Sequence, residues 1–344
     1  MSDTAWRKRL TDSKDALEAV LQHALKWVYP DQDISVIDDL GNLVIRIIDR
    51  TSILTQRKQG EALEQRVHTC CKLPFRQVEE MKLTDNHTAE ALTLFNFSED
   101  SLILADAGFA RTRQLEAIYG KAEFLLRCSP YSINFWEGKE KIDLHQRLKE
   151  HQEAFQFHAH LTKGGPVVRI VALPIPEDKW ADILKRKQNA ARKRQSKKLD
   201  PRNKVFSRWT LLVTSLPERI SMERIGALYT LRWQIEILFR DIKTSLDLRR
   251  IKRCSDTFAR VILTLKLIAW VFAQYALRKL TPALSDQERS RLSPGVFMKQ
   301  LLLSLDHAIC CYFPLVSSIP DLQSLRLLLD HKRFLPRHSV SRSP

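Results

Sequence analysis

Short apolar runs and helix-like patterns alternate along the first 130 residues, which is typical of a mixed α/β fold. Residues 43–48 and 102–105 are uninterrupted apolar runs, as expected of strands buried on both faces. Residues 76–84 alternate in polarity, which indicates a strand with one polar face. Strands are therefore predicted at 43–48, 67–71, 76–84, 102–105 and 123–127, with the second and third forming an antiparallel meander.

Helices follow from apolar residues that recur every three or four positions. The first such pattern stops at Tyr29-Pro30, and Ser221 is a suitable N-cap for a long helix near the middle of the chain. Helices are predicted at 5–28, 87–95, 112–119, 221–246, 258–277, 294–305 and 322–329, followed by a basic tail.

Residues 130–215 have a different character. Two apolar stretches flank the turn Gly164-Gly165-Pro166 and predict a β pair at 155–161 and 167–173. A helix at 174–191 and a strand at 208–214 follow. We therefore expect a helical N-terminal segment at 1–40, a core from 41–129 and 216–280, a β-rich insertion at 130–215, and a helical C-terminal region at 281–344.

The positive charge is concentrated in one part of the chain. The formal net charge is +16 over 344 residues, and residues 185–253 alone hold 20 Lys/Arg against 6 Asp/Glu. This distribution indicates a polyanionic partner, with nucleic acid as the first candidate. Residues 185–204 hold ten Lys/Arg and one acid, so we expect salt-sensitive phosphate contacts there rather than a solvated helix face. The run includes Lys193, Arg194, Lys197 and Lys198.

Cysteine usage and hydropathy predict a soluble cytoplasmic protein. The six cysteines show no CxxC motif and no zinc-ligand spacing, so they are expected to be reduced thiols. The N-terminus lacks the apolar core of a signal peptide. The most apolar run, 261–277, is interrupted by Lys266 and Gln274 and is short for a membrane span, so no membrane partner is expected.

An acidic triad is the strongest candidate for chemistry. Asp49 and Asp106 each follow an apolar strand directly, and Glu236 lies on the long helix. On that helix Tyr229, Arg232, Glu236 and Lys243 form one stripe, because they are spaced by 3, 4 and 7 residues. Alone, Arg232–Glu236 could be an ordinary i,i+4 pair and each Asp a turn residue. Together, grouped carboxylates require a cation, and Mg²⁺ prefers such oxygen ligands.

Two further features have a plainer alternative. His158 and His160 point to one face of a predicted strand and could bind metal, but a surface pair is the favoured interpretation. Trp136, Trp180 and Trp209 lie in or beside the insertion, where core packing competes with stacking on a DNA base.

These motifs resemble the DDE transposases of bacterial insertion sequences, in the group marked by Tyr-x2-Arg-x3-Glu-x6-Lys (the IS-four group). Tyr229, Arg232, Glu236 and Lys243 match that motif in full. Ile48-Asp49-Arg50-Thr51 is similar to the first Asp element, although the family more often has Gly in place of Arg50, and Asp106-Ala107-Gly108-Phe109 is similar to the second. The resemblance covers roughly residues 40–280.

The resemblance implies an RNase H-like core, with a mixed five-stranded sheet flanked by helices and a β-rich insertion. Asp49, Asp106 and Glu236 would hold two Mg²⁺ ions, with Mn²⁺ as a substitute, for DNA cleavage and strand transfer. Tyr229, Arg232 and Lys243 would contact phosphates of double-stranded DNA. The protein would act as a homodimer on nucleoid DNA in the cytoplasm, without a small-molecule substrate.

Two other functions fit the same residues. Only 48 residues precede Asp49, fewer than the family's usual end-binding domain occupies, so a catalytically inactive DNA-binding remnant is one alternative. The other is a nuclease of the same fold that cleaves DNA without strand transfer.

Overall fold

The computed structural model describes residues 3–29, 40–56, 62–73, 77–193, 200–246, 248 and 255–283. Its strands are β1 (Val44–Gln56), β2 (Ala62–Lys72), β3 (Gln77–Asp85), β4 (Ser101–Ala105), β5 (Glu123–Arg127), β6 (Trp136–Glu137), β7 (Glu140–Lys141), β8 (Phe155–His160), β9 (Val167–Pro174) and β10 (Trp209–Thr214). Its helices are α1 (Asp3–Asp12), α2 (Lys14–Val28), α3 (Thr112–Ile118), α4 (Leu144–Lys149), α5 (Glu177–Lys193), α6 (Pro201–Phe206), α7 (Met222–Thr230), α8 (Trp233–Ser245) and α9 (Asp256–Leu280), with 3₁₀ turns η1 (Leu92–Leu94) and η3 (Thr281–Ala283).

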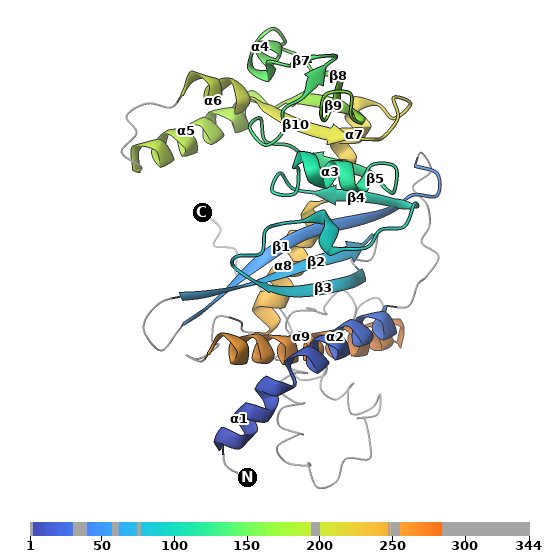
Figure 1. The fold of residues 1–344 in the computed structure, drawn as a ribbon, viewed down its shortest axis with the longest axis vertical. Coiled ribbons are helices and arrows are strands. Elements are labelled where there is room, and N and C mark those ends of the chain that lie inside the picture. The colour runs from blue at the N-terminus through green and yellow to red at the C-terminus, as the bar shows by residue number, and fades with distance from the viewer. Residues whose placement is uncertain are drawn as a thin grey trace, which may run out of the picture.

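The strands form one sheet in the order β3-β2-β1-β4-β5-β10-β9-β8-β6-β7 (Figure 1). Its first five strands confirm the expected mixed sheet: β3, β2 and β1 form an antiparallel meander, and β1, β4 and β5 run parallel. The sheet is larger than the predicted five strands, because β10 pairs antiparallel with β5 and continues it into the insertion. The core and the insertion thus share one hydrogen-bonded sheet.

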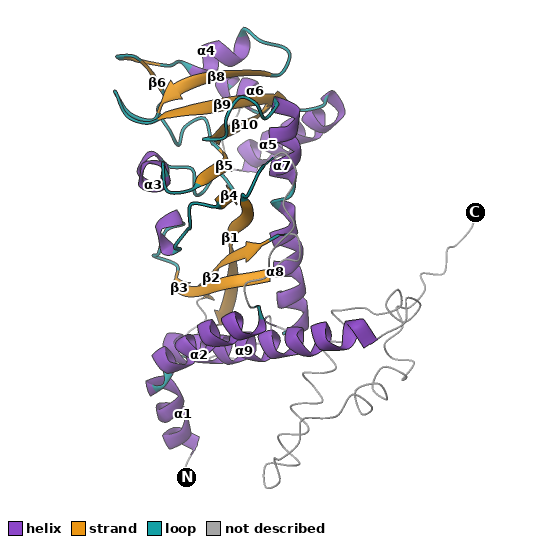
Figure 2. Cartoon of the chain, turned by 90° about the vertical axis from the view of Figure 1, so that its right-hand side faces the viewer, coloured by secondary structure: helices purple, strands orange, loops and turns teal. Residues whose placement is uncertain are grey.

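Successive residues of β1 enter two separate cores, which explains its apolar sequence. Ile47 belongs to a core with α2, α7, α8 and α9, whereas Ile48 packs on the opposite side with α3. Figure 2 shows the same arrangement, with α7 and α8 on one side of the sheet and α3 on the other. Because both faces are covered, β1, β4 and β5 are rich in fully buried Ile, Leu and Phe.

Helix α9 packs beside α2 at one end of the molecule (Figures 1 and 2). It is long and apolar enough to cross a membrane by length and composition. Leu263, Leu267 and Trp270 are nevertheless buried against the sheet core, and Arg260 Nη2 donates to Glu18 Oε2 of α2 at 2.9 Å. These contacts are those of a core helix.

Residues 130–215, the predicted insertion, contain β6 to β10 and α4 to α6. The predicted β pair is confirmed as β8 and β9, and Gly164 has the positive φ of 70° that its turn requires. The helix predicted at 174–191 is α5, which carries Lys193 as its last residue.

Three predicted helices differ from the structure. The pattern at 5–28 divides at Ser13, whose hydroxyl is bonded to the carbonyl of Arg9 instead of capping α2. The helix expected at 87–95 is wrong: only the turn η1 forms. Residues before it are held by side chains, since Asp85 Oδ1 accepts from the Thr88 N–H at 3.0 Å and Arg66 Nη1 donates to the Thr88 carbonyl at 2.7 Å.

The third is the helix predicted at 221–246, which is two helices. Ser221 caps α7 as expected, by accepting from the Arg224 N–H at 3.2 Å. Between α7 and α8 the backbone makes tighter i→i−3 bonds, as in Arg232 N–H to the Tyr229 carbonyl at 3.1 Å. The helices predicted at 294–305 and 322–329 and the basic tail lie outside the described residues.

Candidate active site

Asp49 and Asp106 meet where two parallel strands separate. The ladder between β1 and β4 ends at the pair Ile48 and Ala105, so each aspartate is the next residue of its chain. The sequence suggested that Asp49 follows the end of its strand, but the structure places it within β1. It pairs with Thr69, and β1 continues beside β2 to Gln56 after β4 has ended. Because β4 ends while β1 continues, the carboxylates of Asp49 and Asp106 both lie where the β1–β4 ladder ends.

The junction between α7 and α8 brings the side chains of the helix motif to this edge from the helical side. Tyr229, near the end of α7, donates from its hydroxyl to Asp106 Oδ1 at 3.3 Å. Arg232 is the N-cap of α8, and Glu236 lies in the first turn of that helix. The tight turn between the helices thus presents the phenol, the guanidinium and the third carboxylate together.

Arg232 joins two members of the acidic triad. Its Nη1 donates to Asp49 Oδ2 at 3.2 Å, and its Nη2 donates to Glu236 Oε1 at 2.6 Å. The i,i+4 pair with Glu236 therefore exists, but it is half of a bridge to β1. Arg232 and Asp49 are only 15% and 18% exposed, so this is a partly buried contact and not a solvated pair.

The surroundings of Asp49 disfavour the charged form of its carboxylate. The pKa of Asp49 is raised to about 6, chiefly by burial and also by the nearby carboxylates of Asp106 and Glu90, although the Arg50 N–H and Arg232 lower it. Burial and Asp106 likewise raise the pKa of the Tyr229 phenol, so Tyr229 remains a hydrogen-bond donor at neutral pH. A site that disfavours its own carboxylate charge is suited to a bound cation.

The donor atoms suit a hard divalent cation. Asp49, Asp106 and Glu236 offer carboxylate oxygens, which Mg²⁺ and Mn²⁺ prefer. Within the described part of the chain, however, no three His, Cys, Asp or Glu side chains are grouped closely enough to hold a metal ion. The guanidinium of Arg232 lies between Asp49 and Glu236, so coordination by both requires Arg232 to move.

The other predicted DNA-binding residues are farther from the triad. Lys243 lies in the last turn of α8, about 10 Å along the helix from Glu236 at 1.5 Å per residue, and is exposed. Lys193 ends α5, which belongs to the insertion (Figure 1). Arg194, Lys197 and Lys198 lie outside the described residues.

The two histidines and one of the three tryptophans of the insertion take ordinary structural roles. His160 Nδ1 is bonded to the Gly165 carbonyl at 2.7 Å, and His158 Nδ1 lies 3.6 Å from Glu218 Oε1. Trp209 is buried, which assigns it to the core. Trp136 and Trp180 instead have Lys163 and Arg208 over their rings, at 4.7 and 5.5 Å from the ring centroids.

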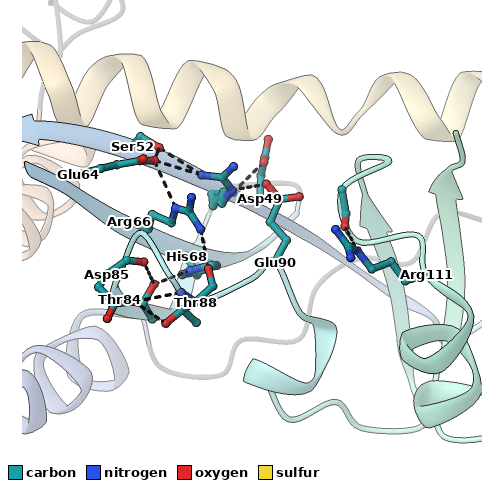
Figure 3. A network of polar contacts seen from close by, with 12 residues as sticks. Asp49, Ser52, Glu64, Arg66, His68, Thr84, Asp85, Thr88, Glu90 and Arg111 are labelled. Carbon is teal, nitrogen blue, oxygen red and sulfur yellow. Dashed lines mark hydrogen bonds and ion pairs between the residues drawn. The ribbon is translucent and has the colours of Figure 1, made fainter. Parts of the chain in front are cut away.

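The sequence did not identify Arg50 and Glu90 as part of the site. Arg50 Nε is paired with Glu90 Oε1, and Glu90 lies in the loop between β3 and η1 (Figure 3). Glu90 falls in the stretch predicted as a helix, where no pattern pointed to β1. The one available signal was Arg50, since it replaces the Gly that is commoner in the resembling family.

Comparison with known proteins places this chain in a known family. The family model described as "Transposase DDE domain" matches residues 41–272. The putative transposase InsL of insertion element IS186A from Escherichia coli K12 is 26% identical over 242 residues, which cover 67% of this chain and 62% of InsL. The transposase of IS421 from Escherichia coli gives the same identity and coverage. That of IS231F from Bacillus thuringiensis subsp. israelensis is 30% identical over 152 residues, or 43% of this chain and 30% of the relative.

Thus the chain spans less than two thirds of the length of these relatives. No solved structure matches it.

Proposed function

This chain belongs to the transposase DDE domain family, and we propose that it cleaves DNA at the ends of an insertion sequence and joins those ends to target DNA. Asp49, Asp106 and Glu236 would hold two Mg²⁺ ions, or Mn²⁺ in their place. The substrates would be double-stranded transposon ends and target DNA, bound by a homodimer on nucleoid DNA in the cytoplasm.

The observation that carries this proposal is the bridge made by Arg232. Its guanidinium contacts Asp49 and Glu236, which lie 187 residues apart in sequence, while Tyr229 contacts Asp106. Three distant carboxylates therefore converge beside a guanidinium and a phenol. Carboxylates serve divalent metal, whereas guanidinium and hydroxyl donors suit a phosphate, and phosphodiester chemistry needs both.

Each side chain has a distinct role in this proposal. Bound metal would lower the pKa of a water or 3′-hydroxyl nucleophile and stabilise the leaving oxygen. Arg232 can release Asp49 once another cation neutralises that carboxylate, and it then presents two N–H donors to a DNA phosphate. Tyr229 keeps its proton and so donates without adding charge. Lys243 contributes a point charge farther along the same helix.

The basic zone would bind DNA without reading its sequence. Lys193, Arg194, Lys197 and Lys198 are proposed to contact phosphates, because lysine and arginine in a run give affinity that depends on salt. Trp136 and Trp180 remain the candidates for stacking on a base, since Trp209 is buried.

The proposal is tested by strand cleavage and joining in Mg²⁺ and in Mn²⁺. The substrate is a labelled duplex carrying the terminal repeats that flank the coding region, with a supercoiled plasmid as target. Asp49→Asn, Asp106→Asn and Glu236→Gln should each abolish both products. Glu140→Gln, an exposed acid of β7, is the matched control and should leave both unchanged. Equal activity in the wild type and Asp49→Asn would refute the assignment.

The same assay separates the two alternatives. Cleaved ends that never join the plasmid would identify a nuclease. Salt-dependent DNA binding without any metal-dependent product would identify an inactive DNA-binding protein.

A further inference from the structure

We propose that Arg50 and Glu90 are positioning residues, which hold the turn carrying Asp106 against the strand carrying Asp49. The inference rests on the proposed function, because it assumes that these two aspartates share metal. Neither residue is in the acidic triad or in the helix motif.

The carboxylate of Glu90 lies between the two segments. Its Oε1 is paired with Arg50 Nε on β1. On the other side, a Cβ built on Gly108 would overlap Oε2 of Glu90 and lie 2.6 Å from its carboxyl carbon. Glu90 therefore occupies the space that any side chain at position 108 would need. Gly108 thus lets the Glu90 carboxylate approach the turn closely, and an added Cβ would force that carboxylate to shift.

Gly108 belongs to a tight turn that includes Asp106. The Phe109 N–H donates to the Asp106 carbonyl at 3.0 Å, and the Ala110 N–H donates to the Ala107 carbonyl at 3.3 Å. Phe109 is buried and anchors the far side of the turn. A displacement of Gly108 therefore cannot be absorbed by Phe109 and is transmitted to Asp106.

Arg50 is itself held on the polar face of the meander. Its Nη1 donates to Ser52 Oγ at 3.2 Å and lies 3.6 Å from Glu64 Oε1. Its own N–H donates to Asp49 Oδ1 at 2.7 Å, so the backbone of Arg50 also orients the catalytic carboxylate.

The loop that carries Glu90 is fixed from the same face. Arg66 Nε lies 3.3 Å from Glu64 Oε1, and Arg66 Nη1 donates to the carbonyl of Thr88 at 2.7 Å (Figure 3). Thr88 is two residues before Glu90 in the chain. The chain of contacts thus runs from β2 through the loop to Glu90 and ends at Gly108.

The pair is better shielded than an ordinary surface ion pair. The side chains of Arg50 and Glu90 are 27% and 21% exposed, so removal of one partner leaves a partly buried charge beside the aspartates. Side chains that orient metal ligands without contacting the ion change metal affinity about 10–100-fold when mutated. We expect a loss in that range.

The test measures Mn²⁺ affinity of the full chain by electron paramagnetic resonance and calorimetry. Glu90→Gln, Arg50→Ala and Gly108→Ala should each weaken Mn²⁺ binding about 10–100-fold. The double variant Arg50→Ala/Glu90→Gln should lose no more than the weaker-binding single variant, because the two residues act as one unit. Thermal unfolding of each variant reports whether the fold is retained.

Glu79→Gln is the matched control. Glu79 Oε2 lies 2.9 Å from Nε of Arg46, which is on β1 as Arg50 is. The side chains of Arg46 and Glu79 are 11% and 25% exposed. This pair lies away from the Asp106 turn, so its loss should cost stability without changing Mn²⁺ affinity.

Three outcomes overturn the inference. If Glu90→Gln and Gly108→Ala keep the wild-type Mn²⁺ affinity while Asp49→Asn loses it, this inference is overturned and the proposed function stands. Weaker binding in Glu90→Gln but not in Arg50→Ala would make Glu90 a metal ligand instead. Equal Mn²⁺ binding by the wild type and Asp49→Asn would overturn the proposed function and this inference together.

Discussion

Arg232 donates to Asp49 at 3.2 Å although 183 residues separate them in sequence. The same guanidinium binds Glu236, so one side chain neutralises two members of the acidic triad. In this arrangement Arg232 occupies the place between the acids where a metal ion would serve both. Arg232 and a divalent cation are therefore expected to compete for Asp49.

Arg232→Gln tests this competition. Without metal the variant should unfold about 1–3 kcal/mol more easily, because removing the guanidinium takes this partner from the largely buried carboxylate of Asp49. Its Mn²⁺ affinity should rise, since the internal cation is gone. Urea unfolding and calorimetry measure the two effects. Arg240→Gln, exposed on the same helix, should change neither, and a wild-type unfolding curve for Arg232→Gln would refute the expectation.

Tyr229→Phe removes only the hydroxyl that contacts Asp106. A hydrogen bond to a charged group contributes about 1.5–3 kcal/mol, so stability should fall by no more than that. Under the proposed function, kcat/KM for DNA cleavage should fall while Mn²⁺ affinity changes little, because the phenol holds phosphate and not metal. Single-turnover cleavage gives the rate. A variant with wild-type cleavage would exclude a role for the hydroxyl.

His68 should make stability depend on pH. The pKa of His68 is lowered from an ordinary 6.5 to about 4, chiefly by burial and also by the charge of Arg50. Between those values the unfolded chain binds more protons than the folded protein, so this contribution to stability is complete above pH 6.5 and is lost as pH falls toward 4.

The measurement compares the free energy of unfolding of the wild type and His68→Gln from pH 4 to pH 7. The difference isolates His68, because the contribution of Asp49 is common to both proteins and cancels. In either protein alone, the raised pKa of Asp49 gives the opposite slope over a similar pH range. The wild type should gain stability relative to the variant as pH rises. His23→Gln, on the exposed side of α2, should run parallel to the wild type. A pH-independent difference for His68→Gln would contradict the shift.

The basic run should control the salt dependence of DNA binding. Each phosphate contact contributes about 0.9 to the slope of log affinity against log salt concentration. Replacing Lys193, Arg194, Lys197 and Lys198 with Ala should therefore reduce that slope by up to about four. Fluorescence anisotropy with a random duplex gives the slope at several salt concentrations. An unchanged slope would place DNA elsewhere on the protein.

The local pattern was sufficient for the elements that are buried on both faces. The structure confirms β4 and β5 with the predicted bounds to within one residue, and the meander of β2 and β3 as well. Such strands can be predicted because a short, uninterrupted apolar run in a highly charged chain indicates a strand buried on both faces. The spacing of Tyr229, Arg232 and Glu236 predicted one stripe on a single helix, whereas the structure divides these residues between α7 and the start of α8.

Tertiary packing decided the rest. It extended β1 beyond Asp49, because β2 continues to supply hydrogen bonds after β4 has ended. It also divided the helix at Leu231–Arg232, where a turn places Arg232 over Asp49. The periodicity of the local sequence predicts neither the extension of β1 nor the break between the helices, since both depend on a partner far away in sequence. The same holds for Glu90, which reaches the site only because Arg50 and Gly108 leave it a place.

The sequence by itself therefore determined which residues could do the chemistry, and the tertiary structure decided how they meet. Residue types and spacing are local properties of the chain, and they selected Asp49, Asp106 and Glu236. Their convergence depends on strand register and on charge compensation in a shielded place, where a cation is needed to offset the cost of grouped carboxylates. Here Arg232 supplies that cation, which only the folded chain could show.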